Sequence, residues 1–140
     1  MPQSMDFIEM LGLALLLTVF WGGALINLFN WNIAKTYAES QGATLYSSFV
    51  LAFGIFWQLV GGALLLKPST AELGCILLIL FTVTSSLQFN QFWKKEGLDR
   101  YISCLYFLSN IGVVGGLLLL TAQIHNLKFP FNLKFFGDLY

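Results

Sequence analysis

The residues of this chain that could do chemistry are polar side chains placed within long apolar stretches. Amides and hydroxyls are costly at membrane depth, and they usually face the interior of a helix bundle. The candidate interior or ligand-facing residues are Asn27, Gln58, Asn90, Ser109 and Asn110. One interpretation is a ligand pocket or polar path around Gln58 and Asn110. The other is interhelical hydrogen bonding, worth about 0.6–2 kcal/mol per pair, which we favour for amides.

Residues that usually carry catalysis or hold cofactors are sparse. Cys75 and Cys104 lie near the starts of the third and fourth apolar stretches. Antiparallel spans would separate them by roughly 20 Å in depth, whereas a disulfide needs Cα atoms within about 7 Å. The single histidine, His125, follows the last stretch, and no pattern of carboxylates and histidines predicts a metal or haem. We therefore expect no catalytic residue, cofactor or metal, and an enzyme acting alone is the least favoured hypothesis.

The composition indicates lipid as the solvent. Of the 140 residues, 57% are hydrophobic and 10% are charged, against about 25% charged in a typical soluble domain. The formal net charge is zero, which argues against nucleic acid as a partner. Membrane lipid is the expected surrounding.

Four apolar stretches are each close to the length of a spanning helix, which is about 20 residues. They predict an all-α integral membrane protein, a four-helix bundle with antiparallel up-down-up-down connections. We expect one domain over residues 1–125, with spans at about 7–27, 45–66, 73–93 and 101–122. Basic residues do not decide the orientation, since three lie on one side of this arrangement and four on the other.

The connections have their own signals. Residues 34–41 predict a short helix that Gly42 ends, and Lys67-Pro68-Ser69 predicts a tight turn. The tail, residues 126–140, interleaves aromatics with lysines. It suits either a segment at the membrane interface or a flexible end that touches the bundle.

Small residues predict where the helices approach one another. In the second stretch Gly54, Gln58 and Gly62 are spaced on one helix face, and Gly112 and Gly116 form a GxxxG in the fourth. A third face runs along the first stretch through Glu9, Gly12, Leu16, Phe20, Gly23 and Asn27. We expect these three faces to meet, with Gly54, Gly62, Gly112 and Gly116 as packing residues.

The two halves of the chain contain similar sequence motifs in the same order. Phe29-Asn30-Trp31 ends the first stretch and Phe89–Trp93 the third, and a Gly-Gly pair followed by leucines occurs in the second and the fourth. This pattern predicts a parallel repeat of two helix pairs. Chance similarity in a sequence of low diversity is the alternative.

The motif Phe89–Trp93, a polar loop and then Phe107–Leu119 resembles the DoxX family of small four-helix bacterial membrane proteins. The resemblance extends over roughly residues 10–122, with Phe107–Leu119 as its most specific part. It implies a multi-pass protein of the bacterial inner (plasma) membrane. It also implies association with a quinone-linked oxidoreductase system.

The chain departs from that family at four polar positions. The family usually carries a lysine at Asn27, a glutamate at Gln58, a histidine at Asn90 and a lysine at Ser109. Their joint replacement by neutral residues is physically coherent, since one surviving charge would be buried without a partner. Any function that depends on charge or proton transfer is then in doubt.

Two functional hypotheses follow. The first is a non-catalytic accessory subunit or scaffold that has a protein partner in a membrane redox complex. The alternative is a binder or carrier of a small hydrophobic molecule, such as a quinone or a lipid, in a cavity lined by Gln58, Asn90 and Asn110. Both hypotheses are compatible with a homo-oligomer.

Overall fold

The computed structural model describes residues 7–125, and the regular structure in this range is helical throughout. The long helices are α1 (Phe7–Phe29), α3 (Ser47–Leu65), α4 (Ala71–Phe89) and α5 (Gly97–Ile124), and the short ones are α2 (Trp31–Ser40) and η1 (Phe92–Lys94). Within residues 7–125, four helices are long and apolar enough to cross a membrane. The prediction of an all-α, multi-pass membrane protein is confirmed at that level. The predicted tail, residues 126–140, lies outside the described residues.

Large apolar side chains cover the outside of these helices. Phe56 on α3 is 64% exposed, and Leu108 on α5 is 57% exposed. In water such a surface would be strongly unfavourable, whereas in a bilayer it meets hydrocarbon. The helices also satisfy their own backbone hydrogen bonds, as a spanning segment must.

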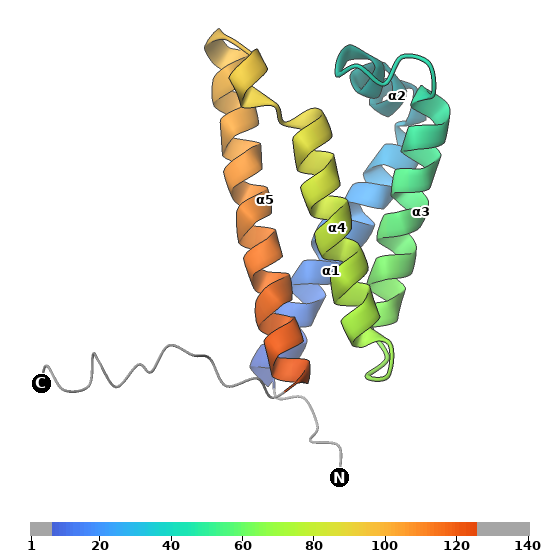
Figure 1. Cartoon of the computed structure of the whole chain (residues 1–140). Helices are drawn as coiled ribbons and strands as arrows, with labels where there is room; N and C mark the ends of the chain where they lie inside the picture. Colours follow the sequence, from blue (N-terminus) through green and yellow to red (C-terminus); the bar gives the residue numbers. More distant parts are fainter. Residues whose placement is uncertain (1–6, 126–140) are drawn as a thin grey trace, which may run out of the picture.

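The long helices alternate in direction along the chain (Figure 1). We call the end with α2 and η1 the upper end, and the end with the start of α1 and the end of α5 the lower end. The packed pairs of long helices are α1 on α3, α3 on α4 and α4 on α5. α4 therefore lies between α3 and α5, and the seam between α1 and α5 is the least closed.

The helices converge toward the lower end. Their shared core contains Phe20, Leu65, Cys75, Leu78 and Leu117, contributed by all four long helices. Gly74 brings α4 directly against α3, because a Cβ at this position would lie 2.9 Å from the carbonyl oxygen of Gly61 and 3.0 Å from the backbone nitrogen of Leu65. Only glycine allows two helix backbones to approach this closely.

Two tryptophans connect neighbouring long helices. The indole N–H of Trp21 on α1 donates to the carbonyl of Leu59 on α3 at 3.2 Å. The indole N–H of Trp57 on α3 donates to the carbonyl of Leu77 on α4 at 2.8 Å. A buried tryptophan needs an acceptor for its single donor, and these two find one across a helix interface.

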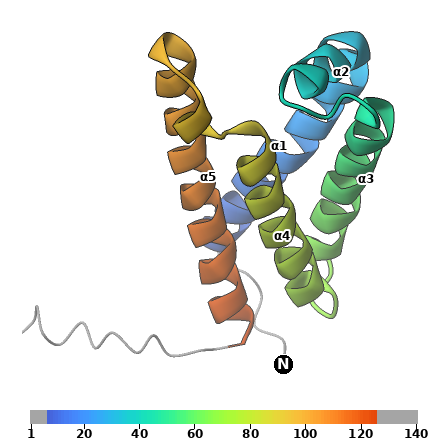
Figure 2. The ribbon, with the colours of Figure 1, turned by 45° about the horizontal axis from the view of Figure 1, so that its top comes forward.

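The helices diverge toward the upper end, where α1, α2 and α3 form one group and α4, η1 and α5 another (Figure 2). A small core of Ala24, Leu51 and Ile55 joins α1 to α3 there, with Trp31 and Ala34 of α2 packed against it. The divergence separates the upper parts of the two groups.

The ends of α2 and α4 can be compared with the bounds predicted from the sequence. The predicted short helix is present as α2, and Gly42 ends it at φ +100°, with hydrogen bonds from Gly42 to Glu39 and from Ala43 to Ala38 that are typical of a glycine cap. The candidate third span extends over Ala71–Lys94, which agrees with the predicted 73–93. Within it α4 ends at Phe89, because Asn90 leaves helical geometry (φ −115°, ψ 41°), and η1 follows.

Candidate functional site

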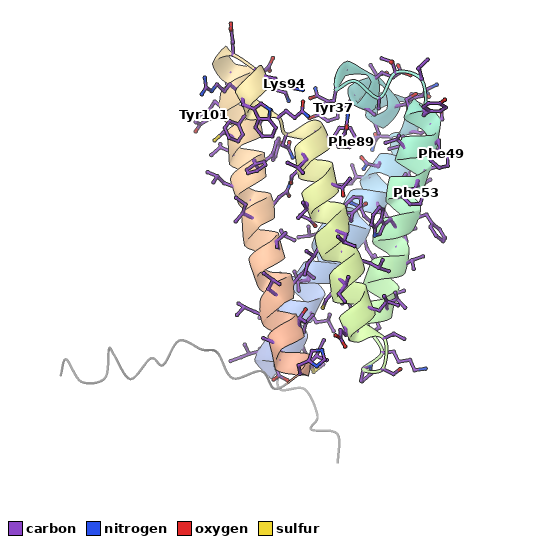
Figure 3. The ribbon with its side chains drawn as sticks, viewed as in Figure 1. Tyr37, Phe49, Phe53, Phe89, Lys94 and Tyr101 are labelled. Carbon is purple, nitrogen blue, oxygen red and sulfur yellow. The ribbon has the colours of Figure 1, made fainter. Side chains whose placement is uncertain are left out.

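A cavity of about 1120 Å³ lies between the two diverging helix groups. All four long helices, α2 and η1 line it. The aromatic rings of Tyr37 on α2 and Phe89 on α4 face each other near its upper end, with centroids 6.3 Å apart, and Lys94 lies close by (Figure 3). Amides and hydroxyls alternate on its walls with apolar groups such as Leu51, Ile55 and Phe81, so the cavity is amphipathic.

Four of the five residues selected from the sequence line this cavity: Asn27, Gln58, Asn90 and Asn110. Ser109 does not. It is exposed on another face of α5, and its hydroxyl donates to the carbonyl of Leu105 at 2.9 Å. Adjacent helical residues point about 100° apart, so Asn110 and Ser109 cannot both face the cavity.

The cavity amides differ in their hydrogen bonding. Asn110 donates through Nδ2 to the hydroxyl of Ser86 on α4 at 2.7 Å, which is the interhelical bond that the structural interpretation requires. By contrast, the Oε1 atom of Gln58 is buried and has no hydrogen-bond partner within the described residues. Such an atom costs roughly 1–3 kcal/mol, so Gln58 holds an unused acceptor beside the cavity.

The upper part of the cavity brings two tyrosines and an aspartate together. Tyr37, Tyr106 and Asp99 all line it. Burial raises the pKa of the Tyr37 phenol, and the charges of Tyr106 and Asp99 raise it further. Tyr37 is therefore a neutral hydroxyl at physiological pH, able to donate a hydrogen bond.

Lys95 lies beside this group and is half-buried. Its ammonium donates to the hydroxyl of Ser103 on α5 at 2.7 Å and to the carbonyl of Phe89 at 3.3 Å. Tyr37 and Lys95 were not selected from the sequence because they lie in the connections, outside the apolar stretches that we searched for polar residues. Ser103 lies near the start of the fourth stretch and was also not selected. The adjacent Lys94 and Lys95 just after Phe89–Trp93 were the one available signal.

A second, mostly apolar groove of about 560 Å³ follows the seam between α1 and α5. Gly12, Gly112 and Gly116 line it, and its lining residue Ser109 is adjacent on α5 to Asn110, which lines the cavity. A Cβ at Gly112 would meet nothing within 4 Å. Gly112 is therefore not the helix contact within the chain that the GxxxG motif predicted.

The other glycines expected at helix contacts do have neighbours. A Cβ at Gly62 would overlap the indole ring of Trp21, whereas at Gly54 and Gly116 it would make ordinary contacts of 3.6 Å with Phe81 and Leu16. Gly23 of α1 lies against Gln58, with its added Cβ 3.8 Å from Nε2. α1 thus touches both α3 and α5 along its predicted face, but α4 separates α3 from α5.

Polar side chains hold the lower ends of the helices together. Gln123 of α5 donates to Glu9 of α1, and His125 lies 2.7 Å from Glu72 of α4. Within residues 7–125 no group of three or more His, Cys, Asp or Glu side chains could hold a metal ion. Cys75 and Cys104 are free thiols.

Comparison with known proteins adds no relative: no family model, no curated protein and no solved structure matches the chain.

Proposed function

We propose that this chain binds or carries a small amphipathic molecule, such as a quinone or a lipid, within the membrane. The observation that carries the proposal is the cavity, whose deep amide Gln58 has an unpartnered buried oxygen. Binding sites for small molecules are concave, with apolar walls and a few polar groups that fix orientation. The cavity has both features at a depth where polar groups are otherwise costly.

The lining residues suggest how a ligand would be oriented. Tyr37 offers a donor, and the amides of Asn27 and Asn90 make no side-chain hydrogen bond to any described residue, so they offer both donors and acceptors. The ring of Phe81 and the side chain of Ile55 offer an apolar wall. Neutral hydrogen bonding at these positions, in place of charges, favours recognition of a ligand over transfer of protons through the site.

The seam between α1 and α5 supports access from the bilayer. The apolar groove lies along its lower part, and its lining residue Ser109 is adjacent on α5 to Asn110 of the polar cavity. A molecule with a hydrocarbon chain could place that chain in the groove and its polar group in the cavity. We propose on this basis an antiparallel bundle that is open along one seam.

The second candidate is a non-catalytic accessory subunit of a membrane redox complex in the bacterial inner membrane, as resemblance to the DoxX family implies. One observation favours it. The groove around Gly112 is apolar and has nothing packed into it from the described chain, and glycine-lined grooves admit a partner's helix in membranes.

The test is native mass spectrometry of the protein extracted in mild detergent from its own membranes, combined with identification of co-purifying proteins. The proposal predicts one small amphipathic molecule bound per chain. A stoichiometric protein partner with an empty cavity would instead support the accessory subunit.

Variants connect a bound molecule to the cavity. Gln58→Leu should remove the bound mass, because it deletes the deep acceptor. Thr84→Leu is the control, since Thr84 is an exposed polar residue of α4 outside the cavity lining, and it should retain the mass. Equal retention in both variants would place the molecule elsewhere.

A further inference from the structure

Lys95 has an unusual environment for a charged side chain. It lies just above the end of α4 and lines the cavity. Its ammonium donates to two neutral oxygens, the hydroxyl of Ser103 and the carbonyl of Phe89. Ser103 is itself 5% exposed, so the lysine is anchored in a fixed position rather than extended into solvent.

The positive charge of Lys95 is not neutralised by the described chain. Within residues 7–125 the ion pairs join Lys35 to Glu39 and His125 to Glu72, and no carboxylate lies within 4.0 Å of the Lys95 ammonium. The cavity lining contains two lysines, Lys94 and Lys95, and one acidic residue, Asp99. An ammonium has three N–H donors, of which Lys95 uses two.

We infer that the ligand of the cavity carries an anionic oxygen group, a phosphate or a carboxylate, and that Lys95 binds it. The inference rests on the proposed function and names the chemistry of its ligand. A half-buried ammonium is stabilised by an anion far more than by neutral oxygens. The free donor of Lys95, with the neutral Tyr37 hydroxyl in the cavity lining of the opposite helix group, supplies the hydrogen bonds for such a group.

The height of Lys95 in the molecule fits this chemistry. α4 ends at Phe89, so Lys95 lies at the upper end of the spanning region, where the anionic groups of lipids lie in a bilayer. The anion could belong to a lipid headgroup or to a soluble anion. Lys67, in the connection at the lower end, has the same charge but lies outside the cavity lining, which makes it a matched control.

The experiment titrates the detergent-solubilised full chain with phosphatidylglycerol or with diacylglycerol, which has identical acyl chains but no phosphate, and counts bound lipid by native mass spectrometry. A hydrogen bond to a charged group is worth enough to predict a preference of about tenfold for the anionic lipid. Lys95→Gln should abolish the preference, Lys95→Arg should retain it, and Asp99→Asn should increase it. Lys67→Gln should leave it unchanged.

Inorganic phosphate added as a competitor separates the two sources of the anion. Displacement of phosphatidylglycerol would indicate recognition of the phosphate group alone, and resistance would indicate recognition of the whole lipid. Equal binding of both lipids by the wild type, or equal losses in the Lys95→Gln and Lys67→Gln variants, would overturn the inference. If the inference failed but Gln58→Leu still abolished lipid binding, the proposed function would stand without the role of Lys95. If lipid binding were insensitive to Gln58→Leu, both the proposed function and the inference would fail.

Discussion

Gln58 and Asn110 are both amides that line the cavity, but we expect them to affect the stability of the protein in opposite ways because only Asn110 is hydrogen-bonded across a helix interface. Asn110 is bonded to Ser86, which is itself 6% exposed, while the Gln58 oxygen has no partner among the described residues. A sequence shows that an amide lies in an apolar stretch, but not whether a neighbour is within hydrogen-bond distance. The interpretation that we favoured from the sequence, interhelical hydrogen bonding of the amides, therefore applies to Asn110 but not to the Gln58 oxygen.

The first prediction compares leucine substitutions at these two positions. Asn110→Leu should lower the free energy of unfolding by about 1–3 kcal/mol, because the buried hydroxyl of Ser86 loses its partner. Gln58→Leu should leave the stability unchanged or raise it, because it removes an unsatisfied polar atom. Thermal unfolding in detergent, followed by circular dichroism, measures both. A loss for Gln58→Leu as large as that for Asn110→Leu would show that Gln58 is hydrogen-bonded.

The second prediction concerns Tyr37. Burial and the nearby Tyr106 and Asp99 raise its pKa above the usual value of about 10. The folded state therefore holds this proton more tightly than the unfolded state does. The resulting stability is present below pH 10 and is lost as the pH rises through the raised pKa. In a spectrophotometric titration, the wild type should contain a phenol that ionises later than free tyrosine and that is missing in Tyr37→Phe. A difference curve centred at the usual value would contradict the structure.

At the scale of elements, the sequence predicted where helices occur but not which glycines bring them together. Runs of apolar residues define the four long helices, and Gly42 defines the end of α2. A Cβ added at Gly74 would meet the backbone of α3 at Gly61, and neither glycine belongs to the spaced motifs. Such spacing identifies a helix face, whereas contact depends on how a neighbouring helix crosses that face.

The third prediction uses this difference between glycines. Gly74→Ala should destabilise the protein by about 1–3 kcal/mol, because its Cβ meets the backbone of α3 at 2.9 Å and cannot displace it. Gly115→Ala should stabilise it by up to about 1 kcal/mol, because the position is open and alanine favours the helix. Unfolding curves of the two variants should shift in opposite directions. A shift in the same direction would contradict the packing of α4 on α3.

The sequence similarity between the two halves of the chain is accompanied by a similar backbone conformation at one position in each half. Asn30 follows the end of α1 with φ −111° and ψ 42°, and Asn90 follows the end of α4 with φ −115° and ψ 41°. Each is followed by a short helix, α2 or η1, and then by a long one. The parallel repeat stays a prediction, and this matching junction is where superposition of the halves should begin.

At the scale of the whole molecule, the cavity was beyond sequence reasoning. It exists because the helices converge on one core at the lower end and diverge at the upper end. That divergence depends on crossing angles, which apolar periodicity does not define. The sequence nevertheless supplied four of the residues that line the cavity, because buried amides are rare enough in membrane helices to stand out.

The fourth prediction tests the alternation of the helices across a membrane. In a Cys104→Ser background, Ser69→Cys and Glu96→Cys should react with a membrane-impermeant maleimide from opposite sides of a proteoliposome. Ser69 lies in the connection between α3 and α4, and Glu96 precedes α5. Cys75 is fully buried and should not react. Labelling of both positions from one side would contradict four spans.

The measurement that tests the central claim most directly is the aqueous accessibility of the cavity wall. Tyr106 lines the cavity, whereas Leu108, two residues further along α5, does not, and both side chains are 57% exposed. They differ chiefly in what they face, the cavity for Tyr106 and lipid for Leu108. In the same Cys104→Ser background, Tyr106→Cys should react rapidly with a small charged methanethiosulfonate in proteoliposomes, and Leu108→Cys should not react. Equal inertness of the two cysteines would show that no open polar cavity exists at this depth, and the proposed binding function would fail with it.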